Sequence, residues 1–309
     1  MIVLKDICKK LERKNILNSI SFHIGSDERV GLIGLNGAGK TTLLNIISGV
    51  LKPDSGFIRV NGAENAIEHR HVLRNMAYVS GTRSQLWEDL QIKGSFDNCI
   101  QMYQIDKKNA EKRMQRLNEV FELERLLAAR PKNLSLGERM RCELAYALLA
   151  EPGILMLDEA MIGLDVSMKY KIMEYFEEYR QEKKPTMIFT SHNLLEVEKL
   201  CDRVILLDKG EVIFDGSIER IMKEFAPLYH LEVRTEGNLP DFEDLPLEKF
   251  SFDKGVFHIV FDKRKIETVH ILKHMLARCQ IKDAKLYEPD LEGTIQKIYQ
   301  KGGSNGTDD

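Results

Sequence analysis

Short apolar runs recur between longer amphipathic segments along much of the chain. Four of them, at residues 30–33, 154–157, 186–190 and 203–207, consist mostly of Val, Ile, Leu, Met and Phe. Runs of this length are typical of strands that are covered on both faces, and the segment between the second and third runs reads as helical. We therefore predict an α/β domain with a mostly parallel sheet.

The segments around these runs differ in character. Apolar stretches at residues 2–4 and 20–24 flank a polar turn and predict two short antiparallel strands. Residues 96–130 are polar, with apolar positions at helical spacing, and Pro131 ends that stretch. We predict an inserted helical subdomain at about residues 82–150.

The composition changes after about residue 225, where a second set of elements begins. It predicts a small α+β domain with strands at 228–234, 256–261 and 282–287 and helices near 265–279 and 289–299. The organisation that we expect is a first domain at 1–225, an accessory domain at 226–301 and a disordered tail at 302–309, which is rich in Gly, Asn and Asp.

Composition and charge narrow the functional classes. The 309 residues are 43% hydrophobic and 30% charged, with a net charge of −3. A protein that coats nucleic acid is usually basic, so we expect no nucleic-acid partner. No long apolar run or signal-peptide pattern is visible, and the five cysteines form no CxxC pair. These features predict a cytosolic protein with reduced thiols.

The strongest local motif lies directly after the first of the four apolar runs. Residues Gly34-Leu35-Asn36-Gly37-Ala38-Gly39-Lys40-Thr41 match the pattern G-x-x-x-x-G-K-[ST], and a helical segment follows from Thr42. Glycines let backbone N–H groups turn toward a polyphosphate, and the helix N-terminus adds positive partial charge. A lysine would meet the β- and γ-phosphates and a threonine hydroxyl would meet Mg²⁺. We therefore predict a nucleotide-binding loop.

Other elements downstream carry polar groups at the ends of predicted strands and helices. Ser135 and Glu138 have the spacing of a helix-capping box, so they either only cap a helix or also present its N-terminus to an anion. Asp158 and Glu159 end an apolar strand, where they could stand near Mg²⁺ and an attacking water. His192 follows another strand, at the edge where α/β proteins bind ligands.

Taken together and in this order, these motifs resemble the nucleotide-binding subunit of an ATP-binding cassette (ABC) transporter over roughly residues 1–220. The resemblance implies a P-loop NTPase fold, ATP and Mg²⁺ as ligands, and a head-to-tail dimer with two ATP molecules at its interface. It assigns Walker A to Gly34–Thr42, the signature loop to Leu134–Glu138 and the D-loop acid to Asp165. The residues that it places around the nucleotide are Gly34, Asn36, Gly37, Gly39, Lys40, Thr41, Thr42, Ser135, Gly137 and Asp165.

The same resemblance implies the chemical roles. Asp158 and Thr41 would hold Mg²⁺, Glu159 would act as general base or position the water, and His192 would be the switch histidine. Ser135 and Gly137 would meet the γ-phosphate that is held by the other protomer.

Two short segments are similar to the ABC-2-type exporter branch, namely Ser84–Leu90 and Glu288–Glu292. Three positions depart from the family pattern. Leu11 stands where an aromatic residue usually stacks on adenine, Thr82 stands at the Q-loop glutamine with Gln85 three residues later, and Ala160-Met161 follow Glu159.

The expected function is therefore ATP hydrolysis by an exporter subunit at the inner face of the cell membrane. It would form a homodimer or heterodimer and drive a separate integral membrane permease of the ABC-2 type. Trp87 is either part of the surface that couples to this permease or an ordinary core aromatic residue. The alternatives are a soluble ABC ATPase in repair or translation and a regulatory half of a heterodimer. The cargo is not specified by the sequence.

Overall fold

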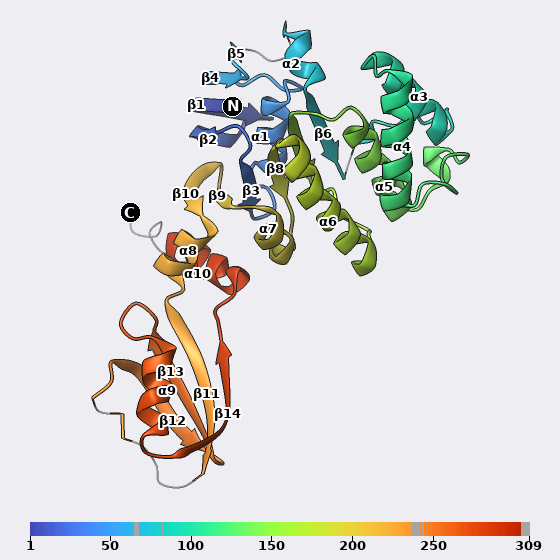
Figure 1. Cartoon of the computed structure of the whole chain (residues 1–309). Coiled ribbons are helices and arrows are strands. Elements are labelled where there is room, and N and C mark those ends of the chain that lie inside the picture. The colour runs from blue at the N-terminus through green and yellow to red at the C-terminus, as the bar shows by residue number, and fades with distance from the viewer. Residues whose placement is uncertain (65–67, 82, 237–240, 243, 304–309) are drawn as a thin grey trace. The chain divides into compact units, whose positions relative to one another are not determined.

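A computed structural model describes residues 1–64, 68–81, 83–236, 241–242 and 244–303 (Figure 1). The chain divides into two compact units, Met1–Gly216 and Ser217–Asp309. This division lies nine residues before the predicted boundary at residue 225. The reason is that α8 (Ile218–Phe225) packs against α10 (Leu291–Gly303) and so belongs to the second unit.

The first unit contains an antiparallel sheet in the order β2-β1-β4-β5. Its strands are β1 (Ile2–Leu11), β2 (Lys14–Ile24), β4 (Ser55–Val60) and β5 (Ala63–Glu64). The polar turn between β1 and β2 closes a hairpin in which Leu11 pairs with Lys14. The two strands predicted at the N-terminus are confirmed, and both are longer than the apolar residues alone indicate.

A six-stranded sheet forms the centre of this unit, in the order β10-β9-β3-β8-β7-β6. Its strands are β3 (Arg29–Gly34), β6 (Met76–Ser80), β7 (Ile154–Asp158), β8 (Thr186–Thr190), β9 (Arg203–Asp208) and β10 (Glu211–Ser217). The pairs β3–β8, β3–β9, β6–β7 and β7–β8 are parallel. The predicted α/β class with a parallel sheet is confirmed, and the carboxyl ends of β3, β7 and β8 meet at one edge.

Helix α1 (Lys40–Ile47) lies between the two sheets of the first unit. Its side chains Leu43, Leu44, Ile46 and Ile47 are almost completely buried. They share one apolar cluster with residues of both sheets, among them Ile7 of β1 and Ile188 of β8. This packing fixes the start of α1 against the end of β3, because the two elements are joined by only five residues.

The remaining helices of this unit include those of the segment that was predicted to be helical. They are α2 (Arg70–Arg74), α3 (Ile92–Met102), α4 (Lys107–Phe121), α5 (Leu136–Leu149), α6 (Val166–Lys183) and α7 (Leu194–Leu200). Helix α5 packs against both α3 and α4, and Figure 1 shows these three grouped together. A short 3₁₀ turn (Pro131–Asn133) precedes α5.

The second unit is built on an antiparallel sheet in the order β12-β13-β11-β14. Its elements are α8, β11 (Leu228–Glu236), β12 (Leu247–Asp253), β13 (Val256–Asp262), α9 (Thr268–Leu276), β14 (Gln280–Tyr287) and α10. Leu231, Val233 and Ile259 point from the sheet into a core that includes Ile271 and Met275 of α9. The α+β character that the sequence predicts agrees with these elements.

Strand β12 was not predicted from the sequence. The strand register shifts between Leu247 and Lys249, where the alternation of apolar and polar residues is also interrupted, so the period-two signal is lost. The predicted tail also differs from the structure at its start, because Gly302 and Gly303 close α10. Residues 304–309, the rest of that tail, lie outside the described residues. In the described part of the chain, none of the helices has the length and apolarity that a membrane span needs.

Candidate functional site

The predicted phosphate loop connects the end of β3 to the start of α1. Gly39 is the N-cap residue of α1 and has φ of 103°, a left-handed conformation that glycine adopts without strain. A Cβ atom at this position would lie 2.6 Å from Leu17 Cδ2 and 3.0 Å from the carbonyl oxygen of Ile16. The glycine of the motif is thus required by both backbone conformation and packing.

Lys40 turns back over this loop. Its ammonium donates hydrogen bonds to the carbonyl oxygen of Gly34 at 2.6 Å and, more weakly, of Leu35 at 3.4 Å. Burial lowers the pKa of Lys40, and the carboxylates of Glu159 and Asp158 oppose this effect. The site therefore presents a desolvated cation at the helix N-terminus, which favours an anionic ligand.

A hydrogen-bond network around Asp158 joins three strands, β6, β7 and β8, to the first turn of α1. The carboxylate of Asp158 accepts hydrogen bonds from the hydroxyls of Thr41 at 2.8 Å, Tyr78 at 3.2 Å and Thr190 at 2.7 Å. Asp158 is only 5% exposed. Burial, together with the nearby Asp158 charge, raises the pKa of Tyr78, so the phenol stays a donor at neutral pH. These bonds fix Asp158 beside the phosphate loop.

Glu159 and His192 face one another at the next layer of the same edge. His192 Nε2 lies 2.8 Å from Glu159 Oε1. The backbone of Glu159 has φ of 54°, which is unusual for a non-glycine residue, and its N–H group is held by both oxygen atoms of Thr190. A cavity of about 130 Å³ beside them is lined in part by Ser191. This volume is large enough for water, so a carboxylate, an imidazole and a water molecule can meet here.

The residues of the predicted signature loop form a separate group. Ser135 caps α5, accepting the N–H of Glu138 while the Glu138 carboxylate accepts the N–H of Ser135. A Cβ atom on Gly137 would lie 2.4 Å from the carbonyl oxygen of Gly163. Asp165 caps α6 by accepting the N–H of Met168. The predicted capping box is confirmed.

Within the described residues, no hydrogen bond or ion pair joins Ser135 or Gly137 to the phosphate loop of the same chain. The structure thus brings Lys40, Thr41, Asp158, Glu159 and His192 together, and keeps the start of α5 as a second, partly exposed group.

Comparison with known proteins agrees with this geometry. The family model described as "ABC transporter" matches residues 17–162. The ABC transporter ATP-binding protein NatA of Bacillus subtilis (strain 168) is 30% identical over 225 residues, which cover 72% of this chain and 91% of NatA. The chain belongs to the ABC transporter family.

Further relatives include an import ATP-binding protein and a nucleotide-bound structure. The methionine import ATP-binding protein MetN of Clostridium tetani (strain Massachusetts / E88) is 30% identical, over 71% of this chain and 70% of MetN. A dimeric post-hydrolysis state of the ATP-binding cassette MJ0796 with ADP and Pi has a TM-score of 0.62 and 25% identity, over 71% of this chain and 99% of the cassette chain. The first unit is thus an ABC ATPase domain with the P-loop NTPase fold.

The predicted departures from the ABC pattern have different structural settings. Leu11, at the end of β1, is 42% exposed, so its side chain is accessible to a base. Ala160 and Met161, which follow Glu159, are both buried. Thr82, the residue at the Q-loop position, lies outside the described residues.

Gln85 is bound in place rather than free at the site. Its side-chain amide donates to the carbonyl oxygen of Tyr78 at 2.7 Å, and its backbone N–H donates to the carboxylate of Glu143 on α5. The hydroxyl of Ser84 also donates to Glu143. The segment that follows the Q-loop position is thus anchored to the helical region of the ABC domain through one buried carboxylate.

Two of these supporting residues escaped the analysis of the sequence. Tyr78 lies in an apolar strand, where a tyrosine gives no sign that its hydroxyl meets Asp158 eighty residues later. Glu143 lies inside an amphipathic helix, and the only available signal was an acidic residue on the apolar side of α5.

Proposed function

We propose that this chain is the ATP-hydrolysing subunit of an ABC exporter that dimerises on ATP and drives a separate ABC-2-type membrane permease. The observation that carries the hydrolytic role is the Glu159–His192 pair at 2.8 Å beside the phosphate loop. Glu159 is the general base or positions the attacking water, and His192 orients Glu159 and is the switch histidine. A carboxylate within hydrogen-bonding reach of a water is the arrangement that this step needs.

The phosphate loop fits a nucleotide polyphosphate. Lys40 neutralises charge on the phosphates. The other residues that surround the phosphates in this proposal are those of the motif, namely Gly34, Asn36, Gly37, Gly39 and Thr42. The oxygen atoms of Thr41 and Asp158 lie 2.8 Å apart, and such hard oxygen donors suit Mg²⁺. When bound, Mg²⁺ would neutralise charge on the phosphates, while Thr190 and Tyr78 hold Asp158 in position.

The signature loop acts across a dimer in this proposal. Ser135 and Asp165 are exposed and Gly137 is partly exposed, so these groups are accessible to a second protomer. Gly137 lies against Gly163, which couples the signature loop to the D-loop within one chain. The second protomer is another copy of this chain or a related ATPase. A related partner would compensate for the departures at Leu11 and Thr82.

The segment Ser84–Leu90 supports the proposed exporter role and the proposed membrane partner. Trp87 is 53% exposed and Leu90 is 37% exposed, which favours a docking surface over a core position for the tryptophan. The backbone N–H of Trp87 is held by the hydroxyl of Ser95 on α3. The subunit would then lie at the cytoplasmic face of the membrane, bound to its permease, with the second unit as an accessory domain.

The decisive experiment is affinity capture of the Glu159→Gln protein from native membranes with Mg-ATP. We expect this variant to lose turnover by at least about 100-fold, because the base is removed while nucleotide binding is retained. It should form an ATP-dependent dimer and retain a multi-span membrane protein, identified by mass spectrometry. Unchanged turnover would exclude the role of Glu159.

Two controls separate the parts of the proposal. Lys40→Ala in the Glu159→Gln background should bind no ATP and form no dimer. Trp87→Ala should lose the membrane protein and keep turnover of the purified subunit within about twofold, as expected for a docking residue outside the site. Capture of ribosomes or of DNA-binding proteins in place of a membrane protein would support a soluble ABC ATPase instead.

A further inference from the structure

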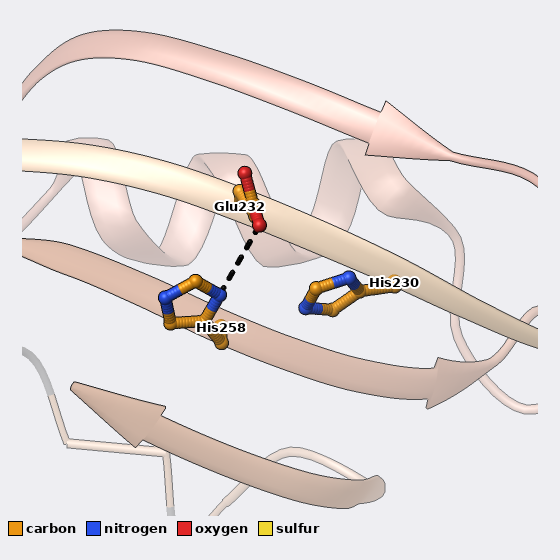
Figure 2. Close-up of side chains that lie close together, drawn as sticks. All are labelled: His230, Glu232 and His258. Atoms are coloured by element: carbon orange, nitrogen blue, oxygen red, sulfur yellow. Dashed lines mark ion pairs between the residues drawn. The ribbon is translucent and has the colours of Figure 1, made fainter. Parts of the chain in front are cut away.

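The outer face of the sheet in the second unit carries an unusual group of polar side chains. The inner face is apolar and packs on α9, so alternate residues of each strand point away from that core. His230 and Glu232 are two residues apart on β11, and His258 is the direct register partner of Glu232 on β13. All three are half-buried and point to the same side, as Figure 2 shows.

The donor atoms of this group converge. One ligand atom from each of His230, Glu232 and His258 lies within 4.8 Å of the other two. His258 Nδ1 is 3.3 Å from Glu232 Oε1, and the rings of His230 and His258 stack with centroids 5.6 Å apart (Figure 2). One donor atom from each of the three side chains is thus close enough to share a single ligand.

We propose that His230, Glu232 and His258 form a binding site for a divalent transition-metal ion of the Zn²⁺ type. Two imidazole nitrogens and one carboxylate oxygen are a donor set that Zn²⁺ uses when a fourth position is left to water. In tetrahedral coordination with bonds of about 2.1 Å, the ligand atoms are about 3.4 Å apart. Binding would require side-chain rotations that shorten the present separations, which are within 4.8 Å, toward that value.

A second layer of contacts supports the carboxylate and one of the imidazoles. The hydroxyl of Tyr287 on β14 donates to Glu232 Oε2 at 3.0 Å, and its ring stacks on His230 at 5.6 Å between centroids. That hydrogen bond leaves Oε1 as the atom of Glu232 that faces the histidines. Residues that orient metal ligands in this way typically change metal affinity by about 10- to 100-fold.

The chemistry of the donors separates this site from the nucleotide site. Mg²⁺ prefers oxygen ligands and octahedral geometry, whereas imidazole favours Zn²⁺, Ni²⁺, Cu²⁺ and Co²⁺. The side chains of Glu232 and His258 are 29% and 36% exposed, so an ion can enter from solvent and keep a bound water. Lys285, the register partner of Glu232 on β14, is exposed and can turn its charge into solvent.

The test is Zn²⁺ titration of the full-length, metal-free protein without nucleotide, followed by calorimetry, with Co²⁺ absorption as a second probe. We expect one ion per chain at this site. His230→Gln, Glu232→Gln and His258→Gln should each weaken binding at least 10-fold, and Tyr287→Phe should weaken it about 10-fold. The matched controls are His270→Gln, on the exposed surface of α9, and His192→Gln, in the ATPase site; both should keep the ion.

Because their side chains lie on the outer face, the three ligand variants should keep the wild-type melting temperature in the absence of metal. With Zn²⁺, the wild type and the two control variants should gain stability, and the three ligand variants should not. Equal affinity in the wild type and in the three ligand variants would overturn the proposal. Loss of binding only in His192→Gln would do so as well, since the ion would then sit beside Glu159. Thiolate-to-Co²⁺ charge-transfer absorption would also overturn it, because it would place the ion at a cysteine.

Discussion

The two units collect their polar groups by opposite means. In the first unit, Thr41, Asp158 and Thr190 come from segments up to 149 residues apart and meet because parallel strands end at one edge of the sheet. In the second unit, His230 and His258 come from neighbouring antiparallel strands and meet on an open face. The first arrangement is buried and held by direct hydrogen bonds, and the second is half-exposed.

This difference predicts how substitutions should affect each of the two groups of residues. Around Asp158 the groups satisfy one another in a buried setting, so the loss of one partner leaves another without a hydrogen bond. On the outer face of the second unit, water replaces a lost partner at small cost. Substitutions should therefore affect turnover strongly in one region, whereas in the other they should change only ligand binding or the stability of that unit.

The largest expected effect tests whether the two cores are energetically separate. Ile259→Ala removes a fully buried side chain from the core of the second unit, and Ile205→Ala does the same in the first. Each should lower the free energy of unfolding of its own unit by about 2–5 kcal/mol. Calorimetric melting should show two transitions, each shifted by only one variant, and ATP turnover should fall only with Ile205→Ala. A single transition that moves equally in both variants would contradict this separation.

A smaller effect compares two buried threonines at opposite ends of β8. Thr190→Val removes the hydroxyl that donates to Asp158 and accepts the N–H of Glu159. Thr186→Val removes a hydroxyl that bonds only the backbone of Gly25 and Asp27 at the other end of the strand. Both should cost about 1–3 kcal/mol of stability, because buried polar groups lose a partner.

The two threonine variants should differ in turnover. Thr190→Val is expected to lower the rate of ATP hydrolysis by about 10-fold, since the position of Glu159 depends on this hydroxyl. Thr186→Val should stay within about twofold of the wild type in the same assay. Equal losses would mean that β8 acts only through global stability.

The smallest effect is a pH dependence that has opposite signs in the two units. Burial raises the pKa of Glu143, partly offset by hydrogen bonds from Ser84 and Gln85. Its favourable contribution is thus fully present below its ordinary pKa of 4.5 and is lost as the pH rises through the folded-state pKa. In the wild type, the free energy of unfolding should fall by about 1.4 kcal/mol for each unit by which this pKa is raised. The Glu143→Gln variant should lack this pH dependence. If the free energies of unfolding of the wild type and Glu143→Gln change equally with pH from 4.5 to 8, the prediction is wrong.

Asp262 in the second unit gives the reverse case. The Arg264 guanidinium, which donates hydrogen bonds to both carboxylate oxygens, lowers the pKa of Asp262 below its ordinary value of 3.8. Its contribution is present above pH 3.8 and is lost as the pH falls through the folded-state pKa. Asp262→Asn should therefore differ from the wild type at neutral pH and approach it below pH 3.8, as measured by denaturant unfolding at each pH.

Some elements were predictable because their signal is local. The phosphate loop, the capping box at Ser135 and Glu138, and the strand that ends at Asp158 are each contained in a few consecutive residues. Strand β12 was missed because a register shift breaks the alternation. The contacts between α8 and α10 place α8 in the second unit, so the division lies before the predicted boundary. Such contacts between distant segments leave no trace in local periodicity.

The sequence by itself determined the ABC ATPase domain and which residues carry its motifs, because backbone conformation, capping and strand character depend on near neighbours in the chain. Tertiary structure alone decided that Tyr78 and Thr190 hold Asp158, that Glu143 anchors Ser84 and Gln85, and that two histidines 28 residues apart converge on one glutamate. The physical reason is that these groups act through distance and burial, which are fixed only when the strands have paired and the core has closed.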